Sequence, residues 1–196
     1  MLNLKTSLRT AAAFIAGLVL AGCALSPQAV NVNPQITPGS YAATGKRISV
    51  TVSDQRASKV LGTRGGIYAQ TSNVTLSSQA PQRLKGSMAG ALTQMGFQIT
   101  TSENADVQMN VILDKLTYQP SVRSLIQVVD LSDAIRIVVS SPNGSSYTGS
   151  FKTEKHHEFS HVPSEETNSK IINELLAETL SHALQDPKLI SAMSRY

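Results

Sequence analysis

The stretch SDQRASKVLGTRGG, residues 53–66, joins charged side chains to a glycine turn. Its candidate binding residues are Asp54, Arg56, Arg64, Gly65 and Gly66. Two guanidinium groups and the backbone N–H groups of a turn could hold an anion such as a phosphate or carboxylate. The alternative is purely structural: the aspartate pairs with an arginine, and the glycines permit a tight backbone. The stretch lacks the lysine and hydroxyl that complete a phosphate loop.

Three of the four histidines lie in the segment KHHEFSH, residues 155–161. Imidazole and carboxylate groups are ligands for zinc or copper, and His157 and His161 would face the same side of a strand. At about 3.3 Å per residue, however, positions four apart on a strand lie roughly 13 Å from each other, too far for one ion. We therefore expect a solvated edge strand, no metal and no cofactor; His157 and His161 are the metal candidates should one bind.

The sequence offers little for catalysis. None of its serines lies in a Gly-x-Ser-x-Gly elbow. The neighbouring acids Glu165 and Glu166 are explained by a helix N-terminus, which favours negative charge. Asp130 and Asp133 could form an acid pair, although nothing distinguishes them from an ordinary strand break. We expect a protein that is not an enzyme.

The only cysteine, Cys23, follows an apolar segment at the beginning of the chain. Residues 1–10 contain two basic residues and no acidic residue, and residues 11–22 are uncharged. This order, with an apolar run of about 7–15 residues and small residues at its end, indicates a secretory signal peptide. The run is shorter than the about 20 apolar residues of a membrane-spanning helix. Residues 1–22 are therefore excluded from the folded domain.

The residues Leu-Ala-Gly-Cys at positions 20–23 resemble the lipobox of bacterial lipoproteins at every position. The resemblance implies cleavage between Gly22 and Cys23, a diacylglyceryl group on the Cys23 thiol and an acylated new N-terminus. Each buried methylene adds about 0.8 kcal/mol to membrane binding, so several chains give a stable anchor. Ala24 stands where an aspartate is the usual inner-membrane retention signal, which points to the outer membrane. The alternative is an ordinary signal peptide followed by a free thiol.

Charge and composition exclude one class of partner. The whole chain has a formal net charge of +4, but two of its 17 basic and none of its 13 acidic residues precede Cys23, so the remainder carries +2. The chain has no long Lys/Arg block and no interleaving of aromatic and basic residues. Nucleic acid is therefore not an expected partner.

Residues 24–45 carry no charge and contain three prolines and two glycines. Such a composition is typical of a tether, and a flexible coil of this length would reach roughly 25 Å. We therefore divide the chain into the signal peptide, a lipidated cysteine with its tether at 23–45, and one periplasm-facing domain at 46–196. The alternation of Val30, Val32 and Ile36 leaves open that part of the tether adds an edge strand to the domain.

The periodicity of the domain predicts a sheet covered by helices. Strands are expected at 48–54, 73–77, 97–102, 105–119, 121–141 with a possible break at 130–133, and 146–160. Helices are expected from Pro81 to Gly96, and from an N-cap at Ser164 to about Pro187. Their apolar stripes are Leu84, Met88, Ala91, Leu92 and Met95, and Ile172, Leu175, Leu176, Thr179 and Ala183. We expect an α+β fold, a mostly antiparallel sheet of about five strands with two helices on one face, in the order β-α-β-β-β-α.

Several motifs are similar to those of the YajG-like lipoproteins of Gram-negative envelopes. They are VNPQI at 32–36, VTVSDQR at 50–56, GTRGG at 62–66, ALTQMGF at 91–97, VQMNVILDKL at 107–116 and LQDPKL at 184–189. The resemblance spans almost the whole chain after the signal peptide. It implies an outer-membrane lipid anchor and a periplasm-facing domain, and it transfers no catalytic residue.

Three functions remain open on this basis. The first is an anchored recognition domain that binds another envelope component, for which we expect a protein, without catalysis. The second is a module for cell-wall fragments or lipid headgroups that uses the 54–66 loop. The third is an envelope hydrolase. A partner protein requires an exposed apolar patch or an unpaired strand edge, whereas a ligand module requires a pocket with convergent polar groups.

Overall fold

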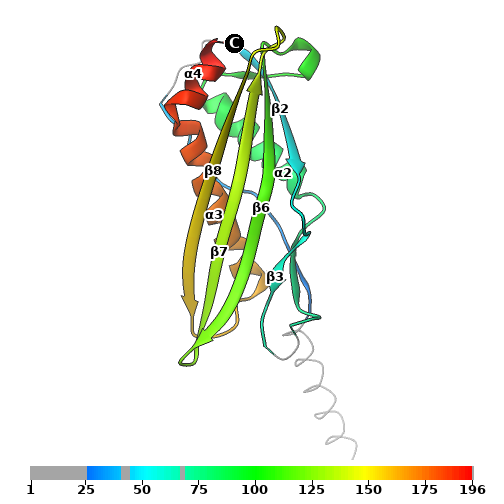
Figure 1. Cartoon of the computed structure of the whole chain (residues 1–196), viewed down its shortest axis with the longest axis vertical. Helices are drawn as coiled ribbons and strands as arrows, with labels where there is room; N and C mark the ends of the chain where they lie inside the picture. The colour runs from blue at the N-terminus through cyan, green and yellow to red at the C-terminus, as the bar shows by residue number, and fades with distance from the viewer. Residues whose placement is uncertain (1–25, 41–44, 67–68, 196) are drawn as a thin grey trace, which may run out of the picture.

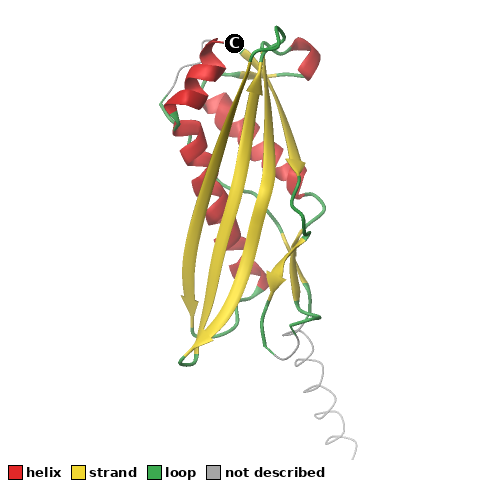
Figure 2. Ribbon diagram, viewed as in Figure 1, coloured by secondary structure: helices red, strands yellow, loops and turns green. Residues whose placement is uncertain are grey.

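Three long antiparallel strands dominate the structure: β6 (Val107–Arg123), β7 (Ile126–Ser140) and β8 (Ser146–Phe159). The computed structural model describes residues 26–40, 45–66 and 69–195. In Figures 1 and 2 the helices lie on one face of the sheet and leave its other face open. The α+β class and the placement of helices on one face are thus confirmed.

The main sheet has five strands in the order β5-β2-β6-β7-β8. The two further strands, β2 (Arg47–Asp54) and β5 (Gln98–Ile99), pair in parallel, as do β2 and β6. Parallel neighbours need a crossover connection, and helix α2 (Ala80–Gln94) lies between β2 and β5 in the chain. The expected, mostly antiparallel sheet is therefore correct for β6, β7 and β8 and wrong for β2 and β5.

A second, smaller sheet has the order β1-β4-β3 and was not expected. Its strands are β1 (Gln28–Val30), β4 (Asn73–Leu76) and β3 (Val60–Thr63). Strand β1 pairs in parallel with β4 at an edge, and Val30, Val32 and Ile36 are buried in the core. Residues 28–36 therefore belong to the folded structure, as in the alternative in which this segment adds an edge strand.

The described helices are α2, α3 (Glu165–Gln185) and α4 (Pro187–Arg195), with a short 3-10 turn at Ser102–Asn104. The two expected helices are confirmed, and their apolar stripes are buried. The third, α4, was missed because Pro187 was interpreted only as a helix stop. Asp186 Oδ1 accepts hydrogen bonds from the backbone N–H groups of Lys188 and Leu189, both at 2.9 Å, so Pro187 instead begins a new helix.

Strand β7 runs without interruption through Asp130 and Asp133, so the expected break at 130–133 is wrong. The turn lies earlier, at Ser124 and Leu125, which adopt φ angles of 47° and 74°. It was not predicted because hairpin turns of this kind favour Asn and Gly at both central positions. Asp130 and Asp133 are three residues apart in a strand and therefore face opposite sides of the sheet, which excludes an acid pair.

The core lies between the sheet and the helices. The expected alternation of β6 is confirmed: Val107, Met109, Val111 and Leu113 are buried. Facing residues of β7 continue the same layer with Val129, Leu131, Ile135, Ile137 and Val139. Among the described residues, no helix combines the length and the apolar character that a membrane crossing requires.

Candidate functional site

A pocket of about 300 Å³ lies where the end of β2, the β4–α2 connection and the first turns of α2 meet. Its apolar wall consists of Val52, Leu76, Ala80, Pro81, Leu84 and Leu113, and its charged residues are Asp54, Arg56 and Lys59. We call it the Arg56 pocket. Its volume falls at the lower end of the range of about 300–1,000 Å³ typical of ligand pockets.

The charged part of the Arg56 pocket is a tightly held ion pair. Arg56 Nε lies 2.8 Å from Asp54 Oδ1, and Nη2 lies 2.9 Å from Oδ2. Lys59 Nζ approaches the same Oδ2 to 2.8 Å. Burial disfavours the ionised form of Asp54, but hydrogen bonds from Arg56 and Lys59 outweigh this effect and hold its pKa well below its ordinary value. Asp54 is therefore a fixed anion, unsuited to accept a proton near neutral pH.

Three polar atoms in the residues of this pocket have no hydrogen-bond partner and are shielded from solvent: Arg56 Nη1, Ser53 Oγ and Ser77 Oγ. Arg56 as a whole is only 7% exposed. A buried polar group without a partner costs about 1–3 kcal/mol, and more for a charged group. An acceptor on a bound molecule would remove this cost once a small movement of the pocket wall exposed one of these atoms, because none of them is open to solvent in the empty pocket.

The electrostatics of the Arg56 pocket favour an anion. The single carboxylate of Asp54 is opposed by two cations, so the side chains leave one net positive charge. The N-terminus of α2 adds to it, because the N-cap residue Gln79 makes no side-chain capping bond and the first turn contains no acidic residue. An uncapped helix N-terminus carries a partial positive charge; its N–H groups contribute less here, because Pro81 has none and Ala80 N–H donates to the carbonyl of Ser77.

The structure does not gather the five candidate residues of the 54–66 stretch in one place. Asp54 and Arg56 line the pocket, but strand β3 then carries the chain away from it. Arg64 donates to the carbonyl of Pro163 at 3.4 Å, and Gly65 N–H donates to Thr63 Oγ1 at 3.3 Å. Gly65 and Gly66 adopt φ angles of 78° and 76°, so these glycines serve a tight turn, as the structural alternative supposed.

The two histidines considered for metal binding do not converge. The His157 ring stacks on Phe159 with centroids 6.2 Å apart, and burial lowers its pKa. His161 Nδ1 lies 3.0 Å from Ser160 Oγ. Within residues 26–40, 45–66 and 69–195, no three His, Cys, Asp or Glu side chains form a group that could hold a metal ion.

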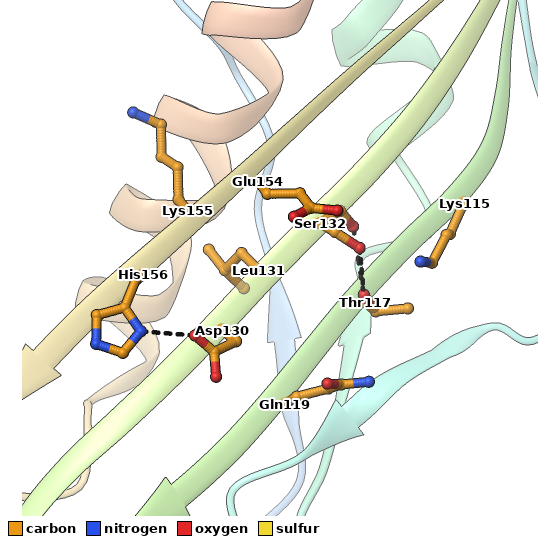
Figure 3. Close-up of a pocket in the computed structure, with 9 residues that line it drawn as sticks. All are labelled: Lys115, Thr117, Gln119, Asp130, Leu131, Ser132, Glu154, Lys155 and His156. Carbon is orange, nitrogen blue, oxygen red and sulfur yellow. Dashed lines mark hydrogen bonds and ion pairs between the residues drawn. The ribbon is translucent and has the colours of Figure 1, made fainter.

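A second hollow, of about 440 Å³, lies on the open face of the main sheet (Figure 3). Its most reactive group is His156, whose Nδ1 lies 2.6 Å from Asp130 Oδ1 and whose Nε2 lies 3.4 Å from Glu158 Oε1. The two carboxylates raise the pKa of His156. With a carboxylate at each ring nitrogen, the charged imidazolium is favoured and neither nitrogen is free to act as a base. The hollow therefore presents a polar, charged surface.

The sequence analysis named Asp54 and Arg56 and allowed for a pair between the aspartate and an arginine, but it missed the apolar wall beside them. Leu84 and Leu113 are visible in the sequence only as core positions of a helix and a strand. No local signal shows that they border the same space as Arg56, because four separate segments build the wall. The candidate cleavage and lipidation residues, Gly22 and Cys23, lie outside the described residues.

Comparison with known proteins identifies the family. A family model described as "Uncharacterized lipoprotein" matches residues 34–194. The uncharacterized lipoprotein YajG of Escherichia coli strain K12 is 23% identical over 179 residues, which cover 89% of this chain and 91% of that protein. The chain belongs to this YajG-like family of lipoproteins.

A solved structure shows a similar fold. Protein XCC0632 from Xanthomonas campestris superimposes with a TM-score of 0.61, covering 87% of this chain and 98% of the other, at 11% sequence identity. At this identity the similarity concerns the fold alone. It agrees with the mixed α+β arrangement described above.

Proposed function

We propose that this member of the YajG-like lipoproteins is a non-catalytic binding protein of the outer membrane, anchored by lipid on Cys23 and facing the periplasm. Its domain binds a small amphiphilic anion in the Arg56 pocket. The lipobox resemblance and the family support the anchor, and the geometry of the pocket supports the ligand. The proposal corresponds to the ligand-module hypothesis from the sequence; it keeps Asp54 and Arg56 and leaves out Arg64, Gly65 and Gly66.

The observation that carries the proposal is the position of Arg56. Its guanidinium is buried, two of its nitrogens are bound by Asp54, and Nη1 has no partner. A protein that evolved only to hold its fold would gain from satisfying that nitrogen or from exposing it to water. Beside an apolar wall, the arrangement suits a ligand with an anionic head and a short hydrocarbon part.

The chemistry of the pocket narrows the ligand class. A carboxylate or phosphate would meet Arg56, Lys59 and the N-terminus of α2, while Leu76 and Leu84 would contact apolar atoms. Lipid headgroup fragments and acylated cell-wall fragments share this chemistry. A wholly polar sugar would leave the apolar wall in water and is disfavoured.

Titration calorimetry tests the proposal. The chain from residue 23 with Cys23→Ser, which carries every described residue, would be titrated with octyl phosphate, octanol and inorganic phosphate. We expect octyl phosphate to bind more tightly than either part alone, because only it satisfies both the charged and the apolar sides. Equal affinity for octyl phosphate and octanol would rule out an anion site.

Matched variants locate the binding. Lys59→Gln removes an exposed cation of the pocket and should weaken octyl phosphate binding several-fold, since an exposed ion pair contributes about 0.2–1 kcal/mol. Lys115→Gln removes an exposed cation on the open face of the sheet and serves as the control. An equal effect of both variants would place the ligand outside the Arg56 pocket.

The unpaired edge of β8 favours a second candidate, an envelope protein partner. β8 is the terminal strand of the main sheet, with 14 residues. A partner could add a strand there. However, the edge carries Lys152, Glu154, Lys155, His156 and Glu158, and charged edge strands are a common means of preventing such pairing. We therefore place this candidate second.

A further inference from the structure

Exposed apolar side chains gather at one end of the described structure. Six large hydrophobic residues are exposed in the described part of the chain, and four of them lie at this end, in the β6–β7 hairpin and the β8–α3 connection: Val122, Leu125, Ile126 and Val162. Three of these form the β6–β7 turn, which we call the hairpin tip (residues 122–126). Leu125 at its apex is 90% exposed. A leucine so fully in water gains nothing for the fold.

The described chain begins at the same end. Gln28, the first residue of β1, is hydrogen-bonded to Asn168 at 2.7 Å, in the first turn of α3. The connection between β8 and α3 begins after Phe159, the last residue of β8. Phe159 pairs with Gln127 of β7, next to the hairpin tip. In Figure 1 the start of β1 and the β6–β7 turn both lie at the lower end of the molecule.

The anchor would hold this end close to the membrane. Only four residues lie between Cys23 and Gln28, and a fully extended chain spans at most about 3.6 Å per residue, or about 18 Å from one to the other. The longer tether expected from composition does not exist between these points, because residues 28–36 are folded into the domain. This step depends on the proposed lipid anchor at Cys23.

The backbone of the turn supports a role for Leu125 outside the fold. Ser124 and Leu125 occupy the left-handed region, with φ angles of 47° and 74°. Residues with a Cβ are disfavoured there, and Asn or Gly normally fills such positions. A strained, exposed leucine persists when its side chain is needed by something other than the chain itself.

We infer that the hairpin tip is a second membrane contact, inserting Leu125, Val122 and Ile126 into the headgroup region of the leaflet that holds the lipid anchor. Attraction between charges is not the main cause, because the two cations at this end, Arg123 and the Pro163-bound Arg64, are matched in number by Glu165 and Glu166 in the first turn of α3. Burial of apolar surface drives the contact, and it orients the long axis of the domain away from the membrane.

Site-directed quenching tests this contact in the full lipidated protein. Single-cysteine variants Ser124→Cys and Ser145→Cys would carry the same environment-sensitive fluorophore; the native thiol is consumed by lipidation. Ser145 lies in the opposite hairpin, between β7 and β8. The proteins would be reconstituted in vesicles of phosphatidylethanolamine and phosphatidylglycerol with a quencher on the upper acyl chain. Insertion to about 5–10 Å would bring the probe within its reach.

We expect strong quenching and a blue-shifted emission at position 124 and neither at position 145. Adding Leu125→Asp to the Ser124→Cys protein should abolish the quenching, and high salt should not. Equal, weak quenching at both positions in protein that floats with the vesicles would overturn the hairpin contact and leave the anchor intact. Protein that does not float would overturn the anchor, and with it this inference.

Discussion

Thr179 Oγ1 lies 2.8 Å from each carboxylate oxygen of Asp133, joining the middle of α3 to strand β7. The backbone N–H of Thr153 on β8 donates to Asp133 Oδ1 at 3.0 Å. Asp133 is 2% exposed. Burial raises its pKa to about 7, although the hydrogen bonds from Thr179 and Thr153 counteract part of the rise. A carboxyl group of the core therefore titrates near neutral pH.

This titration predicts a protein that loses stability as the pH rises. The folded state binds the Asp133 proton more tightly than the unfolded state, so the stabilisation is complete below about pH 4 and is lost as the pH passes through about 7. The loss amounts to at most about 4 kcal/mol, at about 1.4 kcal/mol per unit of pKa. Denaturant unfolding at pH 5 and pH 8 measures the part of this loss that falls above pH 5, at most about 3 kcal/mol.

Asp133→Asn isolates the contribution of this group. The amide keeps an acceptor for Thr153 and a donor toward Thr179 but carries no charge, so the pH 5-to-8 difference in unfolding free energy should shrink. Glu154→Gln, an exposed acid on the neighbouring strand, is the control and should leave the difference unchanged. An unaltered pH profile in Asp133→Asn would show that the carboxyl titrates well below neutrality in the folded protein.

Two glycine-to-alanine substitutions should change the free energy of unfolding in opposite directions, because one glycine is required by close packing and the other is not. A Cβ added at Gly62 in β3 would lie 1.8 Å from the carbonyl oxygen of Tyr118 in β6, so Gly62→Ala must push the two sheets apart. We expect a loss of more than about 2 kcal/mol, as for overpacking in a core. Gly90→Ala in α2, where nothing lies within 4 Å, should stabilise by about 0.5–1 kcal/mol. Urea unfolding of both variants checks the opposite signs.

The sequence contains enough to predict the elements with a strong local period. The stripes of α2 and α3 and the alternation of β6 were correct because burial of one face repeats along each segment. The parallel pairing of β2 with β6 was not predictable, since alternation fixes which face of a strand is buried but not its neighbour. The turn at Ser124–Leu125 escaped because its residues contradict the usual turn chemistry.

For a related reason, the sequence predicted the charged residues of the candidate site but not its apolar wall. Asp54 and Arg56 are two residues apart, so their pairing is a local property that the sequence suggests. The apolar wall joins Val52, Leu76, Leu84 and Leu113, whose proximity follows from the sheet pairing and from the packing of α2. The lack of a hydrogen-bond partner for the buried Arg56 Nη1 can be seen only in the folded structure.

Cys23→Ser tests the anchor on which the location depends. A serine hydroxyl cannot take the thioether-linked lipid, so the variant should move from the membrane to the soluble fraction after cell lysis. The mass of the wild-type protein should exceed that of residues 23–196 by the acyl and diacylglyceryl groups. Ser26→Ala, three residues further on, should leave both measurements unchanged. Undiminished sedimentation of Cys23→Ser with membranes would contradict lipidation at this position.

We expect a more favourable turn sequence at the hairpin tip to raise the stability of the fold and to weaken its contact with the membrane. Replacing Ser124 and Leu125 by Asn and Gly gives the sequence that a turn with two positive φ angles favours, and left-handed backbone costs a side-chain-bearing residue about 1–2 kcal/mol. We expect the double variant to be about 1–2 kcal/mol more stable in urea unfolding, because the turn makes no core contact through Leu125. The same change removes the most exposed leucine and should weaken insertion of the tip. A gain in stability without a change in membrane contact would leave the strained turn unexplained, whereas both changes together would show that the sequence gives up folding energy to keep an apolar side chain at the membrane.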